Sequence, residues 1–230
     1  MGVHVFIIEC AADLQGIDPE LVRYTISTYL SRQRQGGQVE RVIATTEESA
    51  KAEIARFPIW VTTVRSDEDW VVFWLSMHGR NPGTPQKVVT SGEVVVDPST
   101  RATEEIDWCT LLAETPGWPK RTVVLLDVCW GGSPTFTRSA VRSECPAFVL
   151  GSTREAARLE LDAAAALLFG TLGVKGTIDH ENAKKVVDSL NAVFSPNPDT
   201  GTPFYRVWWY DADHHQQRYP EIDRNRFVRI

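Results

Sequence analysis

The sequence has few cysteines and no excess of positive charge, and each shortage excludes a class of protein. Its 230 residues carry 24 Lys and Arg against 30 Asp and Glu, for a formal net charge of −6. Nucleic-acid binding needs clustered Lys and Arg that neutralise phosphates, so DNA and RNA are not expected as partners. The cysteines show no CxxC spacing, which favours reduced thiols over a zinc site or a disulfide framework. The four are Cys10, Cys109, Cys129 and Cys145.

Long hydrophobic runs are also missing, as is the fingerprint of a common cofactor fold. No apolar run reaches the roughly 20 residues that a membrane-spanning helix needs, so no membrane partner is expected. The opening residues MGVHVFIIECAADLQG lack the basic segment and cleavage site of a secretory signal. A dinucleotide-binding protein would carry G-x-G-x-x-G after its first strand, where residues 10–13 read CAAD. The sequence therefore predicts a soluble cytoplasmic protein that needs no cofactor.

One short run, residues 211–215 (DADHH), contains residue types that bind metals. Neighbouring residues do not share a face, and nothing nearby would orient them as ligands. A polar surface turn is favoured, and no metal is expected.

Apolar runs separated by helical patterns make up most of the chain. Three runs are almost entirely apolar, which is typical of strands covered on both faces. Strands that alternate with helices in this way predict an α/β protein, a three-layer α-β-α sandwich around a mostly parallel six-stranded sheet. Residues 1–230 are expected to form a single domain. The predicted strands are 3–10, 39–44, 70–77, 122–127, 147–151 and 204–210, with a β-hairpin at 87–97 (KVVTSGEVVVD).

Capping signals and apolar stripes predict the helices. Residues 45–48 (TTEE) and 152–155 (STRE) each fit a capping box, the second leading into an Ala-rich helix over 154–169. A polar tail is expected after Asp211. The other predicted helices run from 18 to about 36, from Thr103 through Leu112, and over a segment that buries Ala183, Val186, Val187, Leu190 and Val193.

Two predicted strands end in chemically active residues. The strand from 70 runs into His78 and Gly79, and the strand from 122 runs through Asp127 into Cys129. Ligands of parallel sheets gather at the carboxyl ends of the strands, so neighbouring strands would bring an imidazole and a thiol together. This is the equipment for nucleophilic catalysis, with His78 as base and Cys129 as nucleophile. The amides of Gly79 and Cys129 are candidates for an oxyanion hole.

The segments WVVFWLSMHG and VVLLDVCWGG resemble the caspase-like cysteine peptidases, a group that includes caspases, metacaspases, legumain, clostripain and CHAT-domain peptidases. FVLGSTREAARLE looks like the next strand and helix of that fold. The resemblance implies a dyad of Cys129 and His78 that cleaves peptide bonds through a thioester. Residues 133–146 leave little room for a cleavable linker, so the chain resembles a bare catalytic core, constitutively active or controlled by a partner or loop.

The resemblance also gives roles to two polar residues. Metacaspases and clostripain carry Asp two residues before the nucleophile, which would make Asp127 part of the S1 pocket and favour Arg or Lys at P1. The alternative is that Asp127 caps the following glycine turn or pairs with an Arg. Ser152 is expected in the substrate cleft, and a helix cap explains it equally well.

The leading hypothesis is a cysteine endopeptidase that cuts a protein or peptide substrate by limited proteolysis, with an activating partner protein as one form of control. The competing hypothesis is a catalytically silent caspase-like scaffold that binds protein partners. Retention of His78, Cys129 and the glycines that follow each of them speaks against the scaffold.

Overall fold

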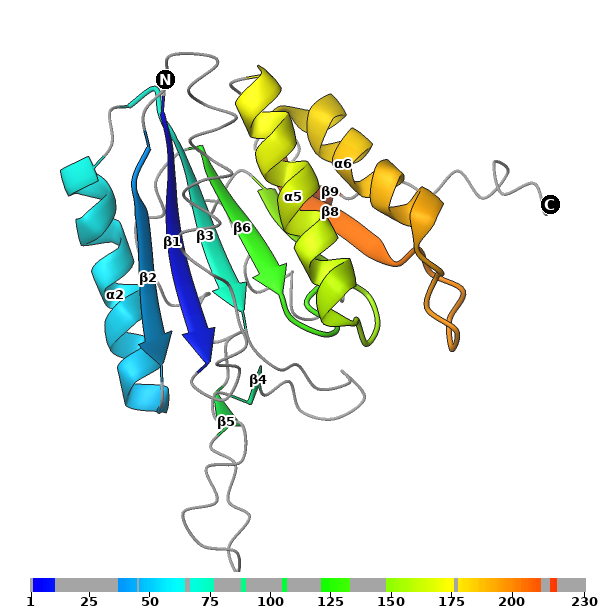
Figure 1. Ribbon diagram of the computed structural model, residues 1–230, viewed down its shortest axis with the longest axis horizontal. Coiled ribbons are helices and arrows are strands. Elements are labelled where there is room, and N and C mark those ends of the chain that lie inside the picture. The colour runs from blue at the N-terminus through cyan, green and yellow to red at the C-terminus, as the bar shows by residue number, and fades with distance from the viewer. Residues whose placement is uncertain are drawn as a thin grey trace, which may run out of the picture.

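The computed structural model describes residues 2–10, 37–44, 46–64, 67–76, 88–89, 105–106, 121–132, 148–175, 178–211 and 216–218. They form a seven-stranded sheet with the order β2-β1-β3-β6-β7-β8-β9 (Figure 1). The pairings from β2 to β7 are parallel, and β8 and β9 are antiparallel additions at one side. The strands are β1 (Val3–Cys10), β2 (Val39–Ala44), β3 (Trp70–Ser76), β6 (Thr122–Asp127), β7 (Phe148–Ser152), β8 (Tyr205–Asp211) and β9 (Gln216–Arg218).

Helices cover both faces of the sheet, because the central strands are apolar on both sides. The core on one face is built with α2 (Glu47–Val64), and the core on the other with α5 (Arg158–Lys175) and α6 (His180–Val193). Every residue of β3, β6 and β7 is buried. The predicted α/β class, three layers and mostly parallel sheet are confirmed. All six predicted strands are present, and β9 adds a seventh where a polar tail was predicted.

The helix ends differ from the sequence prediction in detail. Thr46 caps α2: its hydroxyl accepts from the Ser49 amide at 3.1 Å, and the Ser49 hydroxyl accepts from the Thr46 amide at 2.9 Å. Thr45 lies outside the described residues. At α6, the Asp179 side chain accepts from the Asn182 amide at 2.7 Å. The predicted buried face of α6 is confirmed except for Val193, whose exposed fraction is 75%.

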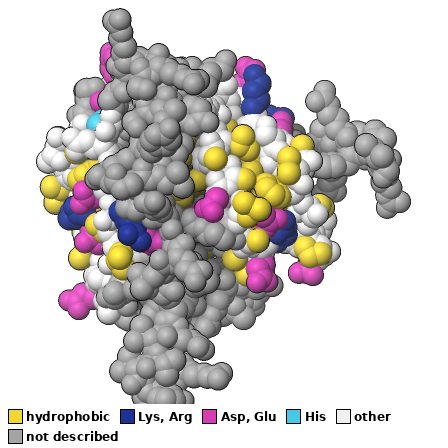
Figure 2. Space-filling model, viewed as in Figure 1, with side chains coloured by type: hydrophobic (Ala, Val, Ile, Leu, Met, Phe, Trp, Pro, Cys, Tyr) yellow, Lys and Arg dark blue, Asp and Glu magenta, His cyan; other side chains and the backbone are white. Residues whose placement is uncertain are grey.

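Figure 2 shows hydrophobic side chains gathered over α5 and α6 on the face turned to the viewer. Three large ones are exposed on these helices, namely Leu159 at 76%, Leu167 at 39% and Val193 at 75%. No helix in the described part of the chain is both long and apolar enough to span a membrane.

The first arm of the predicted hairpin is paired with a segment further along the chain. The first arm forms β4 (Val88–Val89), which pairs antiparallel with β5 (Glu105–Ile106). Residues 105–106 were predicted to be helical, and this is wrong: strand pairing supplies their hydrogen bonds instead. The predicted second arm, residues 93–97, lies outside the described residues, as does the helix predicted from residue 18.

Candidate active site

The two strands that lead to the predicted dyad are neighbours. β3 and β6 are parallel, and Ser76 at the end of β3 stands opposite Asp127 at the end of β6. Cys129 follows Asp127 by two residues, and His78 follows Ser76 by two residues. The chain therefore leaves both strands at the same edge of the sheet. His78 and Gly79 themselves lie outside the described residues.

A row of buried polar side chains crosses the sheet just below this edge. Glu9 is opposite Ser76, Ser76 is opposite Asp127, and Ser152 is opposite Tyr205. Side chains alternate along a strand, and these five share the face that packs against α5 and α6. The exposed fraction of each is 2% or less. The sequence analysis did not identify Glu9, which lies near the end of β1, or Tyr205, which begins β8.

Asp127 is part of this buried row rather than of an open surface. Its Oδ2 atom accepts a hydrogen bond from the indole Nε1 of Trp74 at 3.1 Å. Burial, with a further contribution from the charge of Asp127, raises the pKa of Tyr205 well above its usual value. A bond to an indole N–H was not among the roles that the sequence suggested for Asp127.

The turn after β6 is held by backbone hydrogen bonds to the end of β7. The Trp130 amide donates to the Arg154 carbonyl at 3.1 Å, and the Gly132 amide donates to the Ser152 carbonyl at 2.6 Å. Trp130 has φ 59°, in the left-handed region that bulky residues seldom adopt. Such a conformation persists only where the surroundings impose it. The residue after the candidate nucleophile is therefore fixed by its neighbours.

Glycine is required where this turn crosses β7. A Cβ atom on Gly132 would lie 2.2 Å from the Gly151 carbonyl oxygen. A Cβ atom on Gly151 would lie 2.5 Å from the Gly132 nitrogen. Two backbones thus pass within contact distance, a common reason for glycine beside a functional segment.

Ser152 contributes to the same attachment. Its hydroxyl lies 3.1 Å from the Val128 carbonyl oxygen and 3.1 Å from the Arg154 carbonyl oxygen. The side chain is fully buried and directed at backbone. The helix cap proposed as its alternative role is wrong, because Ser152 ends β7 and α5 begins only at Arg158.

The sulfur of Cys129 lies against the backbone of one residue. The Ala156 amide donates to Sγ at 3.4 Å, and Sγ is 3.8 Å from the Ala156 carbonyl oxygen. Cys129 is only partly buried. Ala156 carries no signal in the sequence, because its contribution is made by main-chain atoms.

Arg154 organises the segment that carries Ala156. Its guanidinium forms a bidentate pair with Glu160, with N···O distances of 2.6 and 3.0 Å. It also donates to the carbonyls of Ser195 and Glu155 and lies 4.3 Å from the centre of the Phe204 ring. These tertiary contacts hold Arg154 out of the helix that the sequence predicted to begin there.

Glu160 supplies the helix start instead. Its Oε2 atom accepts from the Ala157 amide at 2.9 Å, one half of a capping box at the first turn of α5. The hydrogen bonds from Arg154 lower the pKa of Glu160.

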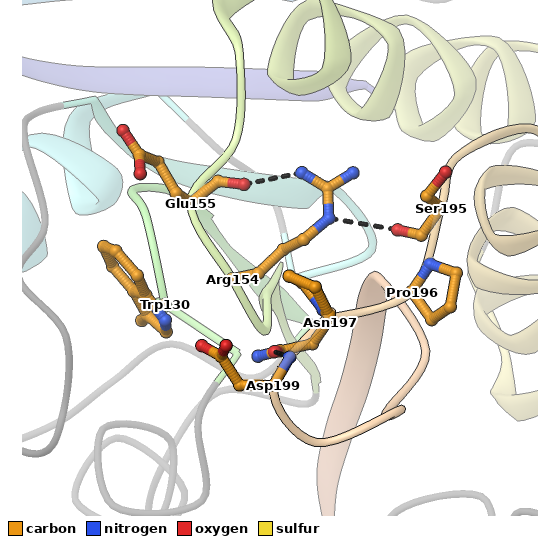
Figure 3. Close-up of a pocket in the computed structure, with 8 residues that line it drawn as sticks. Trp130, Arg154, Glu155, Ser195, Pro196, Asn197 and Asp199 are labelled. Carbon is orange, nitrogen blue, oxygen red and sulfur yellow. Dashed lines mark hydrogen bonds between the residues drawn. The ribbon is translucent and has the colours of Figure 1, made fainter.

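A hollow of about 360 Å³ is lined by Trp130, the residue that follows Cys129. Its walls come from the turn after β6, the connection from β7 to α5, and the loop from α6 to β8 (Figure 3). The lining residues are Trp130, Arg154, Glu155, Ser195, Pro196, Asn197, Pro198 and Asp199.

No group of three or more His, Cys, Asp or Glu residues suited to a metal ion occurs among the described residues. Of the DADHH run, Asp211 is the last residue of β8, and residues 212–215 lie outside the described part.

Comparison with known proteins finds no matching protein-family model and no matching curated protein. Among solved structures, the chain is similar to the crystal structure of the Drosophila initiator caspase Dronc. The sequence identity is 11% and the TM-score 0.43, over 90% of this chain and 78% of that chain.

Proposed function

We propose that the chain is a cysteine endopeptidase in which Cys129 is the nucleophile and His78 the general base. The observation that carries the proposal is the pairing of β3 with β6, in which Ser76 stands opposite Asp127. Neighbouring strands are about 4.8 Å apart, and two residues of chain reach about 7 Å. Residues 78 and 129 each follow this pair by two positions, so a hydrogen bond between them is within reach.

The proposed reaction follows from these positions. His78 accepts the thiol proton, and the sulfur attacks the carbonyl carbon of the scissile peptide bond. His78 then donates that proton to the leaving amine, which leaves a thioester on Cys129 that water hydrolyses. The Ala156 amide, already directed at Sγ, stabilises negative charge on the sulfur before attack. The amides of Gly79 and Cys129 are the proposed donors to the oxyanion.

A preference for Arg or Lys at P1 is part of the proposal. Asp127 places a carboxylate two residues from the nucleophile, in a buried setting where charges interact strongly. Its Oδ2 atom already accepts from Trp74, so it supports a P1 cation chiefly through its charge. An acidic P1 side chain would be repelled.

A panel of fluorogenic peptides with Arg, Lys, Asp or Asn at P1, assayed in the presence of a thiol reductant, tests the proposal. We expect cleavage after Arg and Lys, and we expect Cys129→Ala and His78→Ala each to lower kcat/KM by about a thousandfold or more. Retention of activity in either variant would refute the dyad. Cleavage only after Asp would refute the P1 assignment alone.

A silent scaffold is the second candidate, and the contact between the Cys129 thiol and the Ala156 carbonyl favours it, because a carbonyl acceptor stabilises the protonated sulfur. A sulfur kept as a thiol in this way would react slowly with small electrophiles. Alkylation by iodoacetamide separates the candidates, since a peptidase nucleophile should react faster than free cysteine at neutral pH.

A further inference from the structure

The hollow at Trp130 is lined by three segments that all lie at the carboxyl edge of the parallel strands. Trp130 follows the nucleophile directly, and Glu155 precedes Ala156, whose backbone contacts the sulfur. Asp199 comes from the loop that leads into β8. A ligand in the hollow would therefore contact the chain neighbours of both Cys129 and Ala156.

The loop that carries Asp199 is fixed by a buried asparagine. Asn197 is 6% exposed, and its side-chain amide donates to the Thr153 carbonyl at 2.7 Å. The side-chain oxygen of Asn197 accepts from the backbone amide of Asp199 at 2.9 Å. The backbone amide of Asn197 donates to the Thr202 carbonyl at 2.8 Å. The position of Asp199 is thus set by the fold before any ligand arrives.

The charge available in the hollow is negative. The one lining cation, Arg154, is neutralised by its bidentate pair with Glu160, and its remaining donors are directed at backbone carbonyls. Within the part of the chain that the structure describes, the carboxylates of Glu155 and Asp199 have no hydrogen-bond or ion-pair partner. Two carboxylates and no uncompensated cation therefore line the space.

The hollow also has an aromatic side chain in its wall, that of Trp130. Figure 3 shows the Trp130 ring and the Asp199 carboxylate on one side of the hollow and the Arg154 guanidinium on the other. An indole face attracts cations, and a guanidinium both stacks on it and pairs with a carboxylate. The backbone of Trp130 is held at φ 59° by its hydrogen bond to Arg154, which fixes the point from which the indole extends.

We infer that this hollow is a subsite for a basic side chain of a polypeptide, held between the Trp130 ring and the carboxylates of Asp199 and Glu155. That the ligand is a polypeptide rests on the proposed peptidase function. The subsite is separate from Asp127, which is 2% exposed and bonded to Trp74. Two positions of a substrate can then be basic, one beside the nucleophile and one in this hollow.

Binding to the full chain carrying Cys129→Ala tests the subsite without requiring catalysis. The probes are Nα-acetyl-L-arginine methylamide and its citrulline counterpart, which has the same shape and no charge, both titrated by calorimetry. We expect the arginine probe to bind at least about tenfold more tightly. Asp199→Asn in the same background should remove most of that preference, while the citrulline probe changes little.

Glu181→Gln is the matched control, because Glu181 is an exposed carboxylate on α6 paired with Lys185 and remote from the hollow. It should leave the preference for arginine unchanged. Equal binding of the two probes, or no binding of the arginine probe, overturns the subsite. Loss of the preference in Asp127→Asn but not in Asp199→Asn also overturns it. A chain that binds arginine in this way and cleaves no peptide would contradict the peptidase and leave the subsite standing.

Discussion

Cys129 is held by the main chain of one neighbour. Two contacts come from Ala156, whose amide and carbonyl lie 3.4 and 3.8 Å from the sulfur. The carbonyl accepts from the thiol, and the amide donates to the thiolate, so the same residue serves the sulfur in both states. Because these are main-chain groups, any residue at position 156 would supply both of them except proline, which lacks the N–H.

Ala156→Pro tests this contact. Loss of one hydrogen bond to a charged group costs about 1.5 kcal/mol or more, so alkylation of Cys129 by iodoacetamide at neutral pH should slow roughly tenfold. Ala157→Pro is the matched control, since the Ala157 amide donates to Glu160 and not to sulfur. Thermal unfolding of both variants shows whether they are folded. Equal alkylation rates in a folded Ala156→Pro and the wild type would contradict the role.

At the scale of elements, the start of α5 is set by an ion pair and not by the local sequence. The sequence of residues 152–155 fits a capping box. In the structure, however, Ser152 is the last residue of β7, and Arg154 is paired with Glu160. The helix begins at Arg158, where Glu160 can reach the Ala157 amide. Ala156, whose backbone contacts the Cys129 sulfur, lies between Arg154 and Ala157.

The lowered pKa of Glu160 makes this helix start sensitive to pH. A carboxyl whose folded-state pKa is lowered contributes stability above its unfolded-state pKa of about 4.3 and loses it as pH falls through the folded value. Glu160→Gln should therefore lower the free energy of unfolding at pH 7 by about 1 kcal/mol, after allowance for solvent screening.

Urea unfolding of both proteins from pH 7 to pH 3 measures this difference, which should shrink below about pH 4.3. Glu181→Gln provides the comparison, because the Glu181–Lys185 pair on α6 is exposed and contributes little. A difference that stays constant with pH would show that the Glu160 charge is not responsible.

At the scale of the whole molecule, the turn after β6 and the end of β7 are packed too closely for any side chain. Gly132→Ala would force its Cβ to within 2.2 Å of the Gly151 oxygen, and backbone cannot yield as a flexible side chain would. We expect a loss of about 3 kcal/mol or more in the free energy of unfolding.

Gly201→Ala is the matched variant. Gly201 has φ 66° and open space around its Cβ position, so only backbone strain of about 1–2 kcal/mol should appear. Chemical denaturation of both variants gives the comparison. Similar losses in the two would mean that the turn can move away from β7.

Most of the sheet could be predicted from the sequence because its strands are apolar on both faces, as β3 and β6 illustrate. The capping pattern at 152–155 predicted the wrong start for α5, because Ser152 and Arg154 form tertiary hydrogen bonds instead. The short strands β5 and β9 have no apolar period to reveal them. The neighbouring positions of β3 and β6 could be anticipated. The contact between Ala156 and the sulfur could not, since every residue type except proline carries the same main-chain groups.

The hydrogen bonds that attach this turn to the end of β7 should slow the exchange of its amide hydrogens. The Gly132 amide donates to Ser152 at the end of β7, and the Trp130 amide donates to Arg154 just after it, so both amides of the turn are hydrogen-bonded to this part of the chain. Such amides exchange with deuterium only when a larger unit opens, whereas unattached loop amides exchange by local fluctuation. The residue that follows the sulfur should therefore keep its orientation for as long as the central strands stay paired.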